Sequence, residues 1–169
     1  MKNFLLTLII IGFSCFESVK SNELSWKIVL PDSPSITEKT AAKELQTHIN
    51  LMCGKNFPII AESEADDRNS GILYIGATKH TSNLLEKEHP EPFSFDEIFL
   101  KADGNNLVLT GHARRGALYA VYTFLEDVCG CRWFTEDVSR IPSLEEFSFP
   151  PNLHISYAPK MISREVYNS

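Results

Sequence analysis

The features that most constrain the fold of this chain are two stripes of apolar residues at helical spacing, separated by a series of short apolar runs. The first stripe extends from Ala41 to Met52 and the second from Ala117 to Val128, each with steps of mainly three and four residues. A helix with one apolar face must bury that face against another layer of structure. The runs between the stripes have the length of strands, so a sheet is the expected partner. The 169-residue chain is 43% hydrophobic, which is enough for one core of this kind.

The expected helices have recognisable ends. Ser35 and Glu38 have the spacing of a capping box at the start of the first helix, and Gly54 follows its last apolar residue. The second helix ends at Cys129-Gly130, and a short third helix is expected within residues 78–88. The predicted apolar faces consist of Ala41, Ala42, Leu45, Ile49 and Met52 in the first helix and of Leu118, Val121, Tyr122, Leu125 and Val128 in the second, with Ala117 and Phe124 widening the latter.

Apolar runs predict the strands. Residues 71–76 form a near-continuous apolar run bounded by glycines, which is typical of a strand covered on both faces. Residues 95–102 and 107–111 flank an Asp-Gly-Asn-Asn link, which favours an antiparallel hairpin. Further strands are expected at residues 26–30, 57–60 and 131–134, with Pro58 placing the second of these at a strand start or a sheet edge. The order β-α-β-β-α-β-β-α-β predicts an α/β (α+β) fold, in which helices pack against a mixed sheet with one hairpin.

The segment from Pro142 onward differs from the rest of the chain. Prolines at positions 142, 150, 151 and 159 interrupt it, and it shows little helical pattern. This composition predicts a linker or an extended crossing over the surface that leads away from the domain.

The N-terminus has the pattern of an export signal. Lys2 precedes an apolar run from Phe4 to Phe13, which is too short to span a bilayer and is typical of a signal peptide. Two processing routes remain open. Cleavage after Ser21 would leave Asn22 first, whereas Ser14-Cys15 as a loose lipobox would leave a lipidated Cys15. Either route predicts an exported protein that is periplasmic, secreted or lipid-anchored at the cell surface.

Three cysteines remain after removal of residues 1–21: Cys53, Cys129 and Cys131. An odd number leaves at least one thiol unpaired within the chain. The first interpretation treats all three as small buried side chains. The alternative is a disulfide between Cys53 and Cys129.

Charge and motifs exclude several functions. The net charge is −6 and no run of Lys and Arg occurs, which argues against nucleic acid and anionic membranes as partners. The five histidines are scattered without the spacing of a metal site, so we expect no metal and no cofactor. Many acidic residues occur as two adjacent residues in the sequence. Neighbours in a strand point to opposite faces, so we expect no catalytic carboxylate pair. These pairs are Asp66-Asp67, Asp96-Glu97, Glu126-Asp127, Glu136-Asp137 and Glu145-Glu146.

The segment Gly111-His112-Ala113-Arg114-Arg115-Gly116 leads from a strand into the second apolar helix. Free backbone N–H groups at such an entry can hold an anion. No Lys-Ser or Lys-Thr follows, so the segment fails as a P-loop. The alternative is a tight strand-to-helix turn in which Gly116 lets the helix approach the sheet and the arginines lie in solvent.

Six stretches in this order resemble the N-terminal domain of bacterial α-glucuronidases. They are AAKEL at 41–45, GKNFPI at 54–59, ILYIG at 72–76, LVLTG at 107–111, RGALYAVYTFLE at 115–126 and GCRWF at 130–134. The chain also resembles the second domain of β-N-acetylhexosaminidases and the front of a group of uncharacterised exported bacterial proteins. The resemblance covers about residues 24–160.

The resemblance implies a zincin-like fold without zinc, packed against a following (β/α)₈ barrel that carries the catalytic carboxylates. Residues 22–158 would then be an accessory domain, and residues 159–169 would begin the C-terminal barrel domain. In hexosaminidases a similar Pro-x-x-x-x-Arg segment forms the first barrel strand, which would make Arg164 a binding residue for substrate hydroxyls. The alternative for Arg164 is a solvated residue in a terminal tail.

Two functions are therefore expected. The first is a non-catalytic accessory domain of an exported glycoside hydrolase-like protein, with the catalytic domain of the same protein as its partner. The second is an independent carbohydrate-binding or cell-surface interaction module. A sugar-binding module would need an exposed aromatic platform, for which the candidates are Tyr119, Tyr122, Trp133 and Phe134.

Overall fold

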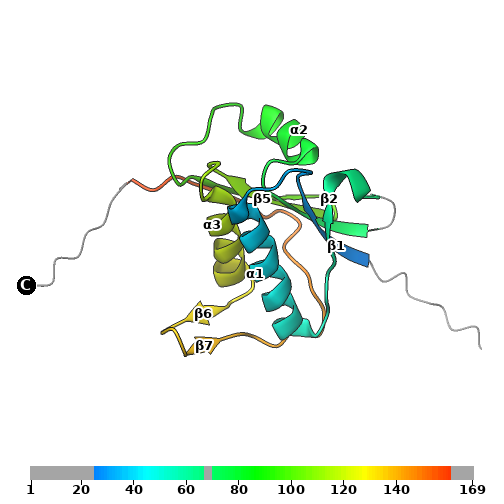
Figure 1. Ribbon diagram of the computed structural model, residues 1–169. Coiled ribbons are helices and arrows are strands. Elements are labelled where there is room, and N and C mark those ends of the chain that lie inside the picture. The colour runs from blue at the N-terminus through cyan, green and yellow to red at the C-terminus, as the bar shows by residue number, and fades with distance from the viewer. Residues whose placement is uncertain (1–24, 67–69, 161–169) are drawn as a thin grey trace, which may run out of the picture.

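The computed structural model describes residues 25–66 and 70–160, and these form a mixed α/β fold. A six-stranded sheet has the order β2-β1-β3-β5-β4-β8. Helices α1 and α3 lie side by side on one face of this sheet, and α2 lies on the other face (Figure 1). A second sheet of two strands, β6 and β7, extends beyond the far ends of α1 and α3 (Figure 1). The predicted fold class is confirmed.

The first four strands in the sheet order are parallel. They are β2 (Ile59–Ala61), β1 (Ser25–Leu30), β3 (Ser70–Ile75) and β5 (Asn106–Gly111). The strand β4 (Ile98–Asp103) forms the predicted antiparallel hairpin with β5, and Gly104 in its turn has a φ of 61°. Ile72, Leu73, Tyr74 and Ile75 of β3 are all buried, as expected of a strand covered on both faces. The short strand β2 lies at the sheet edge, directly after Pro58.

Helix α1 (Ile36–Cys53) begins and ends where the sequence indicates. The Ser35 hydroxyl accepts a hydrogen bond from the Glu38 backbone N–H at 3.2 Å, and the Glu38 carboxylate accepts one from the Ser35 N–H at 2.8 Å. Gly54 ends the helix in the left-handed conformation with a φ of 68°. All five predicted apolar positions of this helix are buried. The other two helices are α2 (Lys79–Glu88) and α3 (Gly116–Thr123), and a 3-10 turn, η1 (Glu62–Glu64), follows β2.

Helix α3 departs from the prediction because it changes to a π-helical turn, η2 (Phe124–Val128). Phe124 and Leu125 in this turn are buried, as predicted. Leu118, Tyr122 and Val128 were also predicted in the apolar face but are only partly buried, and Leu118 and Val128 still pack against the core. The buried face consists of Ala117, Ala120, Val121, Phe124 and Leu125.

The segment after Pro142 does not lead away from the domain, and the prediction of a linker was wrong in this respect. Phe147 is 2% exposed and packs edge-on against Trp26. Strand β8 (His154–Tyr157) then pairs antiparallel with β4 at the edge of the main sheet. The sequence did not reveal this strand, because its four residues are too few to show a pattern between Pro151 and Pro159. Strands β6 (Arg132–Trp133) and β7 (Ser139–Arg140) pair with each other, and only the first was expected.

The three described cysteines are free thiols, so the alternative disulfide between Cys53 and Cys129 is wrong. Cys131 is fully buried and the other two are half-buried. Burial raises the pKa of Cys129 to about 12, which keeps this thiol protonated and unreactive at neutral pH.

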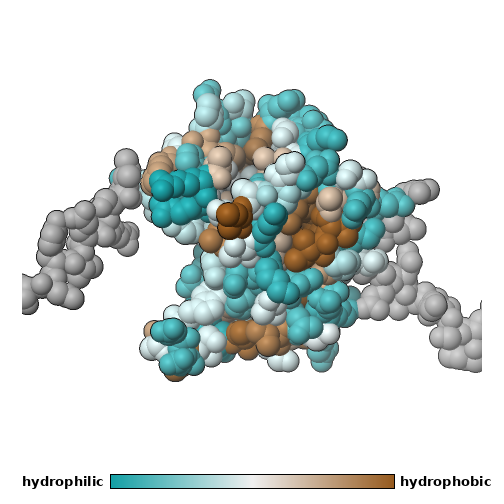
Figure 2. Space-filling view, viewed as in Figure 1, coloured by the Kyte–Doolittle hydropathy of each residue, from teal (hydrophilic) through white to brown (hydrophobic). Residues whose placement is uncertain are grey.

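The surface on the α1 side is partly hydrophobic and partly hydrophilic. Figure 2 shows separate hydrophobic patches, one of them beside α1 toward β1 and β2, within larger hydrophilic areas. Within residues 25–66 and 70–160, every helix is too short or too polar to cross a membrane.

Candidate functional site

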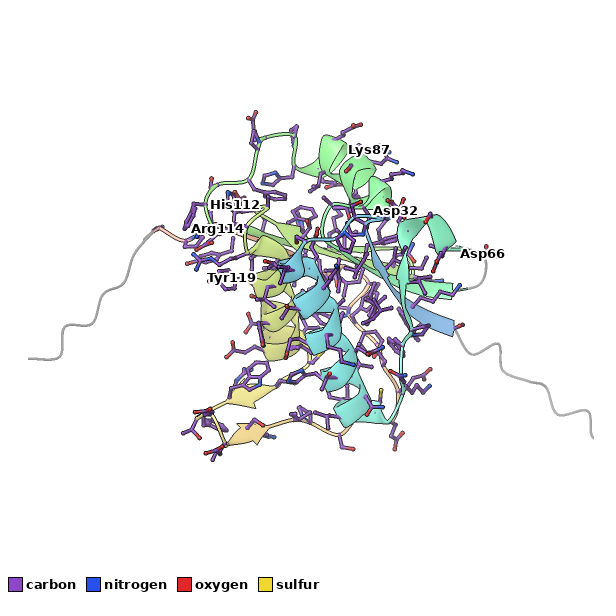
Figure 3. All side chains as sticks on the ribbon, viewed as in Figure 1. Asp32, Asp66, Lys87, His112, Arg114 and Tyr119 are labelled. Carbon is purple, nitrogen blue, oxygen red and sulfur yellow. The ribbon has the colours of Figure 1, made fainter. Side chains whose placement is uncertain are left out.

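A cavity of about 610 Å³ lies where β1, β3 and β5 end. These strands are parallel, so their carboxyl ends meet at one edge of the sheet. The cavity wall comes from the segments that follow them, at residues 33–38, 76–82 and 110–117, together with Leu85 and Phe93. Figure 3 shows Asp32, His112 and Arg114 at this end of the molecule, beside the start of α1.

The cavity opens at a switch in the chain topology. Helix α1 follows β1 and covers one face of the sheet, whereas α2 follows the neighbouring strand β3 and covers the other face (Figure 1). The two connections diverge and leave a crevice between them. In open α/β sheets, ligands bind in such a crevice at the carboxyl ends of the strands.

Glu38 joins the ends of β1 and β3. One of its carboxylate oxygens accepts hydrogen bonds from the Ser35 N–H at 2.8 Å and the Ser35 hydroxyl at 2.9 Å, and the other accepts one from the Ala77 N–H at 3.1 Å. Gly76 has a φ of 79°, and a Cβ at this position would overlap the Glu38 carboxylate. The negative charge of Glu38 therefore lies at the positive end of the α1 dipole, where an external anion would otherwise bind.

The N-terminus of α2 is also satisfied from within the protein. The Thr78 hydroxyl accepts a hydrogen bond from the Thr81 N–H at 3.1 Å, and the two threonine hydroxyls are 2.9 Å apart. The Glu62 carboxylate accepts a short hydrogen bond from the Lys79 N–H. At both helices, carboxylate and hydroxyl oxygens of the chain itself occupy donors that an anion would need.

The segment from Gly111 to Gly116 is a tight turn. The His112 N–H donates to the Glu97 carbonyl at 2.8 Å, and the Gly116 N–H donates to the His112 carbonyl at 2.7 Å. A Cβ on Gly116 would overlap the Gly111 backbone and the Glu97 carbonyl, so only glycine lets α3 start this close to the sheet. With these N–H groups in use, the structure favours the turn over the anion site.

Arg115 does not lie free in solvent as expected for this turn. Its guanidinium donates two hydrogen bonds to the Asp96 carboxylate, at 3.1 and 2.5 Å, and its charge lies 5.5 Å from the centre of the Phe95 ring. The hydrogen bond with Asp96 is the largest cause of a raised pKa at Arg115. Asp96 itself has a φ of 57°, a strained conformation for a residue with a side chain. The pair fixes the loop before β4 to the start of α3.

Glu97, the neighbour of Asp96, binds a different partner. It is 8% exposed and accepts hydrogen bonds from the Ser94 N–H at 2.7 Å and from His89 Nε2 at 2.9 Å. Burial alone would raise the pKa of Glu97, but the Ser94 and His89 hydrogen bonds outweigh it and hold the pKa below its usual value. For His89, burial lowers the pKa, and the bonds to Glu97 and to the Glu91 carbonyl outweigh it and raise the pKa. The two groups therefore form an ion pair beneath the cavity wall, where the His89 ring packs on Phe93 at 4.5 Å.

Comparison with known proteins identifies the family of this domain. Residues 15–124, more than half of the chain, match the family described as "Glycosyl hydrolase family 67 N-terminus". The chain belongs to this family. Its resemblance to α-glucuronidases is therefore confirmed.

The chain is also similar to individual proteins. "Probable alpha-glucuronidase A" of Aspergillus terreus is 25% identical over 109 residues, which are 62% of this chain and 12% of that protein. The chain thus spans about one eighth of the length of this relative. A family GH115 4-O-methyl-α-glucuronidase with specificity for decorated arabinogalactans shares the fold at a TM-score of 0.50 and 11% identity, over 80% of this chain and 18% of that enzyme. A GH138 enzyme targeting pectin rhamnogalacturonan II aligns with a TM-score of 0.42 and 13% identity, over 81% of this chain and 12% of that enzyme.

Two residues singled out from the sequence of this family member lie outside the described residues. They are Arg164, the expected substrate-binding residue, and Cys15, the alternative lipidation site. In the part of the chain that the structure describes, His, Cys, Asp and Glu do not gather in a group of three or more that could hold a metal ion.

The aromatic candidates for a sugar-binding platform are not coplanar. Trp133 is 38% exposed, and its ring meets Tyr122 at 84° and His48 at 72°. Phe134 is 66% exposed on the strand-to-strand turn, and Tyr119 lies on α3 beside Arg115. These rings therefore do not form one flat stacking surface.

Sequence analysis missed the cavity itself. Its wall includes Ser33 and Phe93, neither of which belongs to a motif, and Thr110, which was noted only as part of the stretch at 107–111. A signal was present, because polar residues follow the apolar runs of β1 and β3 and Thr110 ends that of β5. Recognising it required knowing that these three strands are parallel neighbours.

Proposed function

We propose that this chain is a non-catalytic accessory domain of a carbohydrate-processing protein of the α-glucuronidase type. It supports a catalytic domain of the same protein, which performs the hydrolysis. The observation that carries the proposal is the membership of a family described as the N-terminus of glycosyl hydrolases.

The hydrogen bonds made by the carboxylates around the cavity support this role. A glycoside hydrolase needs two carboxyl groups about 5–5.5 Å or about 6.5–9.5 Å apart, with a sugar between them. Glu38 caps α1, Asp96 binds Arg115, and Glu97 binds His89. Each holds two parts of the fold together, so none is free to protonate a leaving group or attack a sugar.

The proposal extends to residues outside the described part of the chain. Arg164 binds substrate hydroxyls at the junction with the catalytic domain, and the protein is exported, with removal of residues 1–21 or lipidation of Cys15. Intact mass spectrometry of protein from the native host tests the export. A retained Met1 would contradict it, and a lipid mass on Cys15 would identify the lipoprotein route.

The test of the main proposal is an assay of the purified chain against aryl glycosides and aryl glucuronides. We expect no release of the aryl group above the buffer rate. Turnover by the chain that disappears in Glu38→Gln, Asp96→Asn or Glu97→Gln would overturn the proposal. Circular dichroism of each variant separates lost chemistry from lost structure.

A carbohydrate-binding or surface-interaction module is the alternative, and the exposed rings of Trp133 and Phe134 are the observation in its favour. The variant Trp133→Ala distinguishes the two. Loss of binding to an insoluble polysaccharide would favour the alternative, whereas an accessory role leaves this variant with the same retention as the native chain.

A further inference from the structure

The cavity at the ends of β1, β3 and β5 is lined by a threonine whose hydroxyl has no hydrogen-bond partner among the described residues. Thr110 lines the cavity and is 4% exposed. Its side chain lies on the α2 face of β5, as does that of Val108 two residues earlier. Among the residues that the structure describes, none forms a hydrogen bond with the Thr110 hydroxyl. The hydroxyl can therefore bond to a ligand that enters the cavity.

The charge of the cavity selects the class of ligand. Glu38 lines it and carries a negative charge, and Glu62 neutralises the start of α2 nearby. A phosphate or a carboxylate in the cavity would be repelled by Glu38 and would find the donors of α1 and α2 already occupied. The cavity therefore disfavours an anionic ligand.

The remaining polar groups are mostly hydroxyls. Ser33, Thr37 and Ser82 line the cavity together with Thr110, and His112 adds an imidazole. The Thr37 and Ser82 hydroxyls donate to the Arg114 and Thr78 carbonyls and can still accept, so this set matches a ligand whose own hydroxyls donate.

One wall of the cavity is apolar. Leu85 and Phe93 line it from the α2 side, and the Phe93 ring is fixed by its contact with His89. A sugar ring has hydroxyls at its edge and C–H groups on its faces, and such a face packs against an aromatic ring. The volume of about 610 Å³ lies in the range of small-molecule sites, roughly 300–1,000 Å³.

From these observations we infer that the cavity binds a neutral sugar unit, either a free monosaccharide or the end of a neutral glycan, with the Thr110 hydroxyl as a ligand-binding group and Phe93 as the stacking surface. This inference does not depend on the accessory role, because it assigns a binding site to the domain itself.

The experiment titrates the purified chain with two matched pairs, glucose with glucuronate and galactose with galacturonate, followed by NMR chemical shifts. We expect at least one neutral sugar to bind saturably and to shift signals of Thr110, Ser82 and His112. The matching uronate should bind about two- to fivefold more weakly, because of Glu38. Methyl glycosides and a neutral tetrasaccharide, tested in the same way, distinguish a free monosaccharide from a glycan end.

The matched variants are Thr110→Val and Thr123→Val. Each removes one hydroxyl from a β-branched side chain, but Thr123 lies outside the cavity wall. We expect Thr110→Val to weaken binding of the neutral sugar about three- to tenfold, with an unchanged or slightly higher Tm, and Thr123→Val to leave binding unchanged.

Three results would overturn the inference. They are the absence of saturable binding by either neutral sugar, tighter binding of the uronates than of their neutral partners, and an equal loss of affinity in the two variants. These monosaccharides have no glycosidic bond to hydrolyse, so failure here is independent of the hydrolysis assay above.

Discussion

The two faces of the main sheet are built differently. The α1 and α3 face is covered by two helices and by the segment around Phe147, over a continuous cluster of buried apolar residues. The α2 face has one ten-residue helix over a small buried cluster of Val29, Ile72, Tyr74, Phe99 and Val108. The cavity lies at the end of the sheet where α2 begins. Burial of apolar area dominates stability, so the fold depends on the first face, and the second is left free to carry polar groups and open space.

The largest expected effect tests this difference directly. Leu125→Ala in η2 removes a side chain with no exposed surface from the α1 and α3 face, and should lower the free energy of unfolding by about 2–5 kcal/mol. Leu84→Ala, at a half-buried position in α2, is the matched control and should cost less than about 1.5 kcal/mol. Urea denaturation of both variants measures the difference. Equal losses would mean that the two faces contribute alike.

An intermediate effect is expected where the cavity meets α1. Gly76→Ala forces a side chain into a conformation with a φ of 79° and against the Glu38 carboxylate, and should cost about 1–3 kcal/mol. Gly104→Ala is the control, since its φ is 61° but nothing lies within 4 Å of the added Cβ. A smaller loss in Gly76→Ala than in Gly104→Ala, measured by urea denaturation, would show that Glu38 does not hold this junction.

The smallest effect concerns pH and the His89–Glu97 pair beside α2. The pKa of His89 is raised from 6.5, so its contribution to stability is complete below pH 6.5 and is lost as the pH rises through the folded-state pKa. The pKa of Glu97 is lowered from 4.5, so its contribution is present above pH 4.5 and is lost on acidification. Thermal unfolding should show a decrease in Tm above pH 6.5 that is smaller in His89→Gln. An identical pH profile in this variant would rule out the ion pair.

The sequence predicted best the features that depend on local patterns. Local patterns indicate both caps and all the buried apolar positions of helix α1, and the glycine-bounded run of β3 identifies a central strand. These features depend on neighbours within one helix turn or one strand, which a sequence displays directly.

The errors arose where the outcome depends on distant parts of the chain. Leu118 and Tyr122 of α3 are only partly covered by the rest of the fold, and β8 exists because the exposed edge of β4 accepts it through residues 98–101. The cavity combines ends of three strands and a loop residue, Phe93, that lie far apart in the sequence. Local patterns carry no information on such pairings until the sheet order is known.

The measurement that tests the comparison most directly is native-state hydrogen exchange, resolved by residue, with and without saturating neutral sugar. Amides of α1 and β3 should exchange only through global unfolding, whereas those of α2 should exchange through local opening at a lower free energy. The neutral sugar should raise protection in α2 and around Thr110, and leave α1 unchanged except through the overall gain in stability. Exchange of α1 at or below the free energy of α2, or protection by the sugar confined to α1, would contradict this account of the two faces.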